Sequence, residues 1–159
     1  MRTRDFDLTR RAALLTVGGV GFGAAILGLG AASAAPSAAE SRNAKLVRNF
    51  CKVWKGKDID LDKVADAYLA DDCVLDLVEG QPPAVGKAAA KALFQAFMKN
   101  GERYDLKIVE TFAKGPVVAN SRVDTTIVAG KPPEAAPVVG VFIVKDGKIG
   151  KWSDYPVKA

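Results

Sequence analysis

The stretch VVGVFIVKDGKIGKWSDYPV, residues 138–157, decides the fold of this chain. Two apolar runs rich in β-branched residues flank Asp146-Gly147, a pair typical of a two-residue hairpin turn. Upstream, turn residues separate further runs of the same kind. The pattern predicts four strands, over 103–112, 117–128, 136–144 and 148–157. Because short connections join them, we expect neighbouring strands to pair in antiparallel fashion.

The segment before these strands is helical in pattern. Apolar residues recur at helical spacing over 38–55, a shorter helix is expected over 60–69, and a third over 87–99. One additional strand is expected over 73–78. Helices followed by strands predict an α+β domain over residues 35–159, with N-terminal helices packed on a curved antiparallel sheet that encloses an internal pocket.

Residues 1–34 have the pattern of an export signal rather than of a folded domain. A basic start precedes an apolar stretch rich in Gly and Ala and a small-residue site at Ala32-Ser33-Ala34. Arg10-Arg11 resembles the pair of a twin-arginine signal. The chain is therefore expected to pass through the twin-arginine translocase to the periplasm or beyond. An uncleaved membrane anchor over 12–35 is the alternative.

Composition restricts the chemistry. The chain has no histidine, which excludes Ser-His-Asp and Cys-His catalysis and any His-ligated metal site. Its net charge of +5 is not gathered into a basic run with interleaved aromatic residues, so a nucleic-acid partner is not expected. Cys51 and Cys73 are expected to be buried thiols, with a disulfide as the alternative.

Two charged patches interrupt the apolar strands. Arg122 and Asp124 share one strand face, and Trp152 and Asp154 share a face of the next-but-one strand. If both faces line one cavity, an arginine lies between two carboxylates, an arrangement suited to acid–base catalysis. Alternation alone leaves open which face is inside. On the opposite reading the charges form a solvated ladder, with Asp154 protecting a sheet edge.

The runs SRVDTTIV and VVGVFIVKDGKIGKWSDY resemble the limonene-1,2-epoxide hydrolase family, which shares the cone-shaped nuclear transport factor two-like fold with SnoaL-like cyclases and ketosteroid isomerases. The family's Arg-x-Asp falls on Arg122 and Asp124, and its Trp-x-Asp-Tyr on Trp152, Asp154 and Tyr155. The resemblance implies a one-step hydrolysis without metal or cofactor. In it Asp154 is the general base, a protonated Asp124 is the general acid, and Arg122 bridges the two. It also implies a homodimer.

The sequence departs from that family at one pair of residues. The family's water-holding Tyr-x-Asn pair is replaced by Leu75 and Leu77, and Asn120 is expected to supply part of the missing function. The expected pocket residues are Asn120, Trp152, Leu75 and Leu77. The expected function is hydrolysis of a small apolar epoxide to a diol by an exported enzyme. The alternatives are a non-catalytic periplasmic module that binds a hydrophobic ligand, and an isomerase or cyclase of the SnoaL-like or ketosteroid isomerase type.

Overall fold

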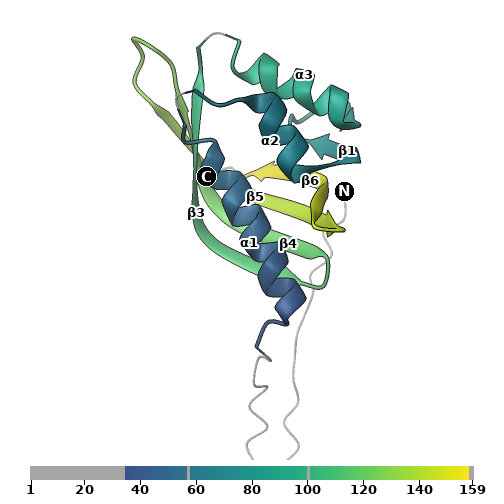
Figure 1. Ribbon diagram of the computed structural model, residues 1–159. Helices are drawn as coiled ribbons and strands as arrows, with labels where there is room; N and C mark the ends of the chain where they lie inside the picture. The colour runs from purple at the N-terminus through teal and green to yellow at the C-terminus, as the bar shows by residue number, and fades with distance from the viewer. Residues whose placement is uncertain (1–34, 57, 100, 158–159) are drawn as a thin grey trace, which may run out of the picture. The chain divides into compact units, whose positions relative to one another are not determined.

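A computed structural model describes residues 35–56, 58–99 and 101–157, and the expected export signal over 1–34 lies outside that range. Figure 1 shows helices and strands in the expected order. The elements are α1 (Ala38–Val53), α2 (Leu61–Tyr68), β1 (Leu69–Asp76), β2 (Ala84–Val85), α3 (Lys87–Phe97), β3 (Arg103–Lys114), β4 (Val117–Ile127), β5 (Glu134–Lys145) and β6 (Lys148–Pro156). The α+β class is confirmed.

The start of α1 is fixed by a capping box. The Ser37 hydroxyl accepts a hydrogen bond from the Glu40 backbone N–H at 3.2 Å, and the Glu40 carboxylate accepts one from the Ser37 N–H at 2.7 Å. The same carboxylate accepts the N–H of Gly115, in the β3–β4 turn, at 2.9 Å. These bonds lower the pKa of Glu40 to about 2, the Gly115 bond most. Glu40 therefore ties the first turn of α1 to the sheet.

The sheet is mixed rather than wholly antiparallel, with strand order β2-β1-β6-β5-β4-β3. Strands β3 to β6 form the expected antiparallel meander, but β1 pairs with β6 in parallel. The expectation missed this pair because hairpin signals report only pairing between strands close in sequence. It also began β1 at Cys73, whereas β1 follows α2 directly at Leu69, and it missed the two-residue β2.

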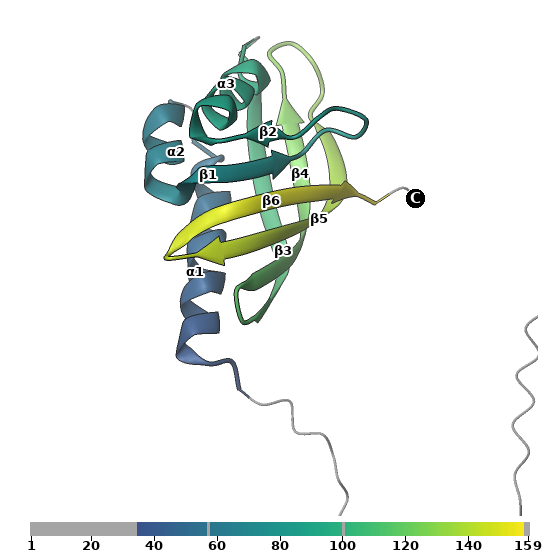
Figure 2. The ribbon, with the colours of Figure 1, turned by 90° about the vertical axis from the view of Figure 1, so that its right-hand side faces the viewer.

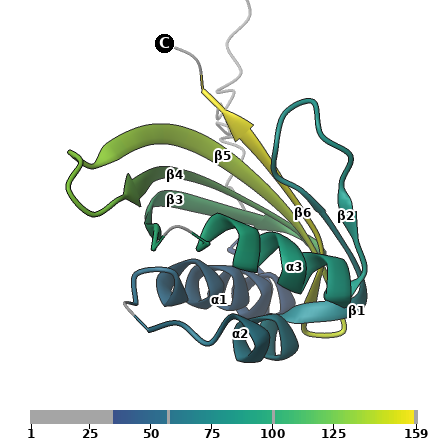
Figure 3. The same ribbon diagram turned by 90° about the horizontal axis from the view of Figure 1, so that it is seen from above.

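The helices lie against the concave face of this sheet, as Figures 2 and 3 show from two sides. Aromatic rings fill the space between the layers, where Phe50 from α1 and Trp54, the C-cap residue of that helix, meet Phe94 from α3 and Trp152 from β6. Phe50 meets Trp152 edge-on at 5.0 Å between ring centroids, and Trp54 meets Phe94 at 4.9 Å. Such edge-to-face pairs add to the stabilisation from apolar burial. The core therefore holds the sheet in its curved form.

Two sequence expectations concern the rest of the molecule. Cys51 and Cys73 are both buried free thiols, as the first alternative had it. Burial raises the pKa of Cys51 to about 12. No helix among the described residues is long and apolar enough to cross a membrane.

Candidate functional site

The buried guanidinium of Arg122 organises the concave face. Its side chain is fully buried, whereas the side chains of Asp124 and Asp154 remain 22% and 13% exposed. Arg122 donates to Asp124 through Nε and Nη2 at 2.7 and 3.0 Å, and Nη2 also donates to Asp154 Oδ2. One guanidinium therefore bridges two carboxylates that come from different strands, β4 and β6.

Gly140 on β5 makes this bridge possible. Gly140 lies between Asn120 of β4 and Asp154 of β6 in the strand register. A Cβ atom at Gly140 would overlap Arg122 Nη1 and lie 2.8 Å from Asn120 Oδ1. Because the middle strand has no side chain there, the guanidinium can cross it and reach β6.

Asp154 is the more buried of the two carboxylates. Its Oδ1 accepts a 2.6 Å hydrogen bond from the Trp152 indole N–H, and its Oδ2 accepts from Arg122. Burial raises the pKa of Asp154 above its ordinary value, although Arg122 and Trp152 both act in the opposite direction. A carboxylate with a raised pKa is a stronger base, provided that it is ionised at the working pH.

Arg122 stays charged in this setting. Burial acts to lower its pKa, but the carboxylates of Asp154 and Asp124 outweigh burial and raise the pKa above its ordinary value. The guanidinium carbon also lies 5.8 Å from the Trp152 ring centroid, within the range of a cation–π contact. A fixed positive charge between two carboxylates stabilises either one when it is ionised.

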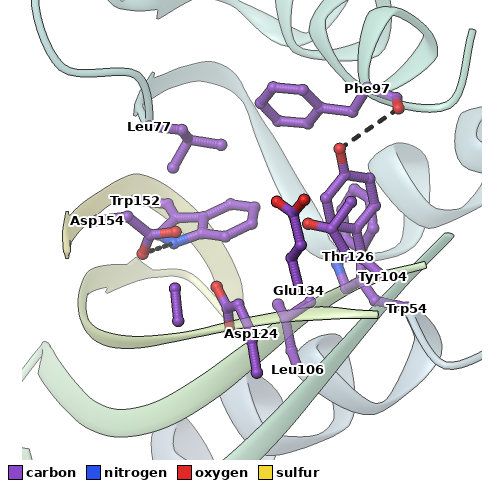
Figure 4. A pocket seen from close by; sticks show the side chains of 12 residues that line it. Trp54, Leu77, Phe97, Tyr104, Leu106, Asp124, Thr126, Glu134, Trp152 and Asp154 are labelled. Atoms are coloured by element: carbon purple, nitrogen blue, oxygen red, sulfur yellow. Dashed lines mark hydrogen bonds between the residues drawn. The ribbon is translucent and has the colours of Figure 1, made fainter. Parts of the chain in front are cut away.

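A cavity of about 360 Å³ opens above the bridge, and both carboxylates line it. Figure 4 shows Asp154 and Trp152 at one end and Tyr104 and Trp54 at the other. The remaining walls are mostly apolar or small, from Leu77, Phe97, Leu106, Thr126, Glu134, Ala135 and Ala136. An apolar cavity with a few convergent polar groups is typical of a small-molecule site.

The structure brings together the three predicted catalytic residues, Arg122, Asp124 and Asp154, but only two of the four predicted pocket residues line the cavity. Trp152 and Leu77 do so, whereas Asn120 and Leu75 are both 1% exposed and lie in the interior.

The corrections at Asn120 and Leu75 have physical reasons. Asn120 lies beneath Arg122, where its Oδ1 accepts from Arg122 Nη1 at 3.2 Å and its Nδ2 contacts Cys51 Sγ at 3.7 Å. It is therefore a support for the guanidinium and does not replace the water-holding pair. Leu75 pairs with Trp152 at the level of the core, and Leu77 lies two residues farther along.

Sequence reasoning missed the other end of the cavity. Tyr104, Thr126 and Glu134 form a cross-strand row on β3, β4 and β5. Alternation places Thr126 on the same strand face as Asp124, so the sequence pattern could have predicted Thr126 as a lining residue. Tyr104 depends on the register of β3 against β4, which shifts between Ile108 and Glu110, and Glu134 depends on register across the longer β4–β5 connection, and sequence fixes neither.

No group of three or more His, Cys, Asp or Glu side chains that could hold a metal ion occurs in the part of the chain that the structure describes. The arrangement can bind an apolar molecule, hold a water or substrate proton at a carboxylate, and stabilise the charge that results.

Known structures share this architecture. An LEH-like epoxide hydrolase from M. tuberculosis is 28% identical, with a TM-score of 0.64 over 74% of this chain and 84% of that one. A protein from Xanthomonas campestris described as a polyketide cyclase is 25% identical, with a TM-score of 0.62 over 73% and 90%. A protein of ketosteroid isomerase-like fold from Catenulispora acidiphila, at 17% identity and a TM-score of 0.61 over 70% and 84%, is similar in fold.

No curated protein sequence is significantly similar to this chain. The model of the SnoaL-like domain, however, matches residues 47–152, a span that contains Arg122, Asp124 and Trp152 and ends two residues before Asp154. The chain therefore belongs to the SnoaL-like domain family.

Proposed function

We propose that this protein opens the epoxide ring of a small, largely apolar molecule to a diol by one-step acid–base catalysis. The observation that carries the proposal is the buried Arg122 that joins Asp124 and Asp154 while both carboxylates line one apolar cavity. The similarity to an LEH-like epoxide hydrolase supports it. Two carboxylates in unlike environments are the usual means of placing an acid and a base in one site.

In this mechanism Asp154 is the base. It takes a proton from a water molecule as the water oxygen attacks one epoxide carbon and the C–O bond to that carbon breaks. The raised pKa of Asp154 suits this role. Its two hydrogen bonds, from Trp152 and Arg122, fix the direction of the carboxylate.

Asp124 is the acid and supplies a proton to the opening oxygen, so that the product leaves as a neutral diol. Arg122 holds Asp124 through two hydrogen bonds and stays within reach of Asp154. Asp154 gains one proton from the water while Asp124 gives one proton to the epoxide oxygen. The net charge of the site bridged by Arg122 therefore does not change.

The wall beside Asp154 is Leu77. Leucine holds no water by hydrogen bonding, so the attacking water depends on Asp154 for its position. This feature favours one second candidate, an isomerase in which Asp154 moves a proton next to a carbonyl group and no water is needed. Exchange of the α-protons of cyclic ketones in D₂O, followed by NMR, tests that candidate.

The first experiment is diol formation by the purified chain on a panel of cyclic and terpene epoxides. The matched variants are Asp154→Asn, Asp124→Asn and, as a control, Asp105→Asn, a partly exposed carboxylate outside the cavity lining. General acid or base help contributes roughly a hundred- to ten-thousandfold each. We expect loss of that size in the first two variants and none in the third. Diol formation in none of the proteins would overturn the proposal.

We further propose that the protein acts after export, as the sequence of residues 1–34 predicts. N-terminal sequencing of the protein from the exported fraction tests this, with a start near Ala35 as the expected result and an intact Met1 in the membrane fraction as the contrary one.

A further inference from the structure

The end of the cavity remote from Asp154 carries two polar groups that the proposed chemistry does not use. The first is the indole N–H of Trp54. Trp54 is 3% exposed and lines the cavity, and its Nε1 has no hydrogen-bond partner in the part of the chain that the structure describes. Native proteins rarely leave a buried donor in this state, because the donor has lost its hydrogen bond to water and no hydrogen bond within the protein replaces it.

The second group is the Glu134 carboxylate. Figure 4 shows it reaching into the cavity, between Trp152 on one side and Tyr104 on the other. No side-chain hydrogen bond or ion pair joins the Glu134 carboxylate to any other residue in the part of the chain that the structure describes. Glu134 is exposed to solvent, and because an ionised carboxylate is an acceptor only, a ligand that binds it must bring a donor.

Two other polar groups nearby are already engaged. The Tyr104 hydroxyl donates to Glu102 Oε2 at 2.9 Å, and burial raises the pKa of Tyr104 to about 12, so it keeps its proton. The second indole of the cavity, Trp152, donates to Asp154. Trp54 and Glu134 therefore stay open as a donor and an acceptor for a ligand at this end, and the Thr126 hydroxyl, which also lines the cavity, lies between the strands of Tyr104 and Glu134.

A hydroxyl group matches both at once, because its oxygen accepts one hydrogen bond and its O–H donates another. An ammonium group would satisfy Glu134 but offers nothing to Trp54, and a carbonyl or ether oxygen would satisfy Trp54 but not Glu134. A purely apolar ligand leaves both unpaired.

Strand register gives the distance between the two ends. Glu134 pairs with Thr126, two residues along β4 from Asp124. Two residues of strand span about 7 Å. A ligand of the size of one six-membered ring with a short substituent can therefore reach from Asp124 to this end of the cavity.

We propose that the substrate carries a hydroxyl group at the end opposite its epoxide, and that Trp54 Nε1–H and the Glu134 carboxylate bind it. This assignment deepens the proposed function and rests on it for the reaction, but the hydroxyl subsite can be tested by binding alone. Trp54 and Glu134 are specificity residues in this account.

The binding test uses two inert ligands of matched shape, cyclohexylmethanol and ethylcyclohexane. The chain has two tryptophans, so its ¹⁵N spectrum holds two indole N–H signals, and Trp54→Phe assigns them. We expect the alcohol to move the Trp54 signal downfield more than the hydrocarbon does, and to bind about fivefold more weakly to Glu134→Gln than to the unaltered chain. The control is Glu110→Gln, an exposed glutamate outside this cavity.

The kinetic test compares 1,2-epoxy-4-(hydroxymethyl)cyclohexane with its 4-ethyl counterpart. We expect kcat/KM to favour the hydroxymethyl epoxide, mainly through KM, and the preference to fall about fivefold in Trp54→Phe and in Glu134→Gln. Equal binding of the two inert ligands to the unaltered chain, or an equal preference in Glu134→Gln and Glu110→Gln, would overturn the hydroxyl subsite. If the alcohol binds as expected while neither epoxide reacts, the subsite stands and the epoxide-hydrolase proposal fails.

Discussion

Gly140→Ala tests how the central bridge is built. The new Cβ would overlap Arg122 Nη1 and approach Asn120 Oδ1 to 2.8 Å and Phe142 to 3.0 Å. Arg122 is fully buried and held by Asp124, Asp154 and Asn120, so it has no free space to move into. Overpacking of this kind costs about 1–3 kcal/mol of unfolding free energy, or roughly 4–12 °C in Tm for a domain of this size.

The same substitution should affect activity more than stability. When the guanidinium shifts, it loses its contact with Asp154, and misplacement by about 1 Å in a catalytic site can cost a hundredfold in rate. Gly150→Ala is the matched control, because a Cβ at Gly150 meets only Ile143 O at 3.7 Å and Lys145 Cβ at 3.8 Å, which are ordinary contacts. Tm by calorimetry and kcat for diol formation are measured on both variants. If the two variants behave alike, the argument that Gly140 makes room for Arg122 is wrong.

Three further outcomes are expected. The raised pKa of Asp154 means that folding favours its protonated form, so its contribution to stability is fully present below about pH 3.8 and is lost as pH rises through the folded pKa. The unfolding free energy of the unaltered chain minus that of Asp154→Asn should therefore fall as pH rises above about 3.8 in urea titrations, and a flat or rising difference would contradict the shift. Glu40 has a folded pKa of about 2 against an ordinary 4.5, so Glu40→Gln should lower Tm at pH 7 and its deficit should shrink as pH falls from 4.5 towards 2, whereas a deficit that is constant with pH would refute the role of the charge. Cys51, buried and with a pKa of about 12, should resist iodoacetamide at pH 8 until urea unfolds the chain, and rapid labelling of the native protein would show that the thiol is accessible.

Much of the fold was predictable because its signals are local. Asp146-Gly147 between two apolar runs predicted the β5–β6 hairpin, and the turns around Gly115 and Gly130 separated the other strands. The parallel pairing of β1 with β6 was not predictable in this way, because it joins segments from opposite ends of the domain and depends on how the helices pack.

The candidate site was predictable in part for the same reason. Alternation put Arg122 and Asp124 on one face, but the direction of that face became clear only from the burial of Arg122 and its contact with Asp154 of β6. Leu75 and Leu77 also share a face, yet their positions along β1 differ, since Leu75 is level with the core at Trp152 and only Leu77 reaches the cavity. How far a residue lies from the cavity along a curved sheet depends on the tertiary structure, and strand periodicity does not report it.

Single-turnover hydrolysis in H₂¹⁸O, with enzyme in excess over an epoxide that the panel shows to be a substrate, tests the central claim most directly. If Asp154 activates water for a one-step attack and Asp124 protonates the leaving oxygen, every diol formed carries one ¹⁸O atom and the protein carries none. Mass spectrometry of the diol and of the peptides that contain Asp124 and Asp154 measures both. Unlabelled diol together with ¹⁸O in either carboxylate would show a covalent ester intermediate and contradict the acid–base account.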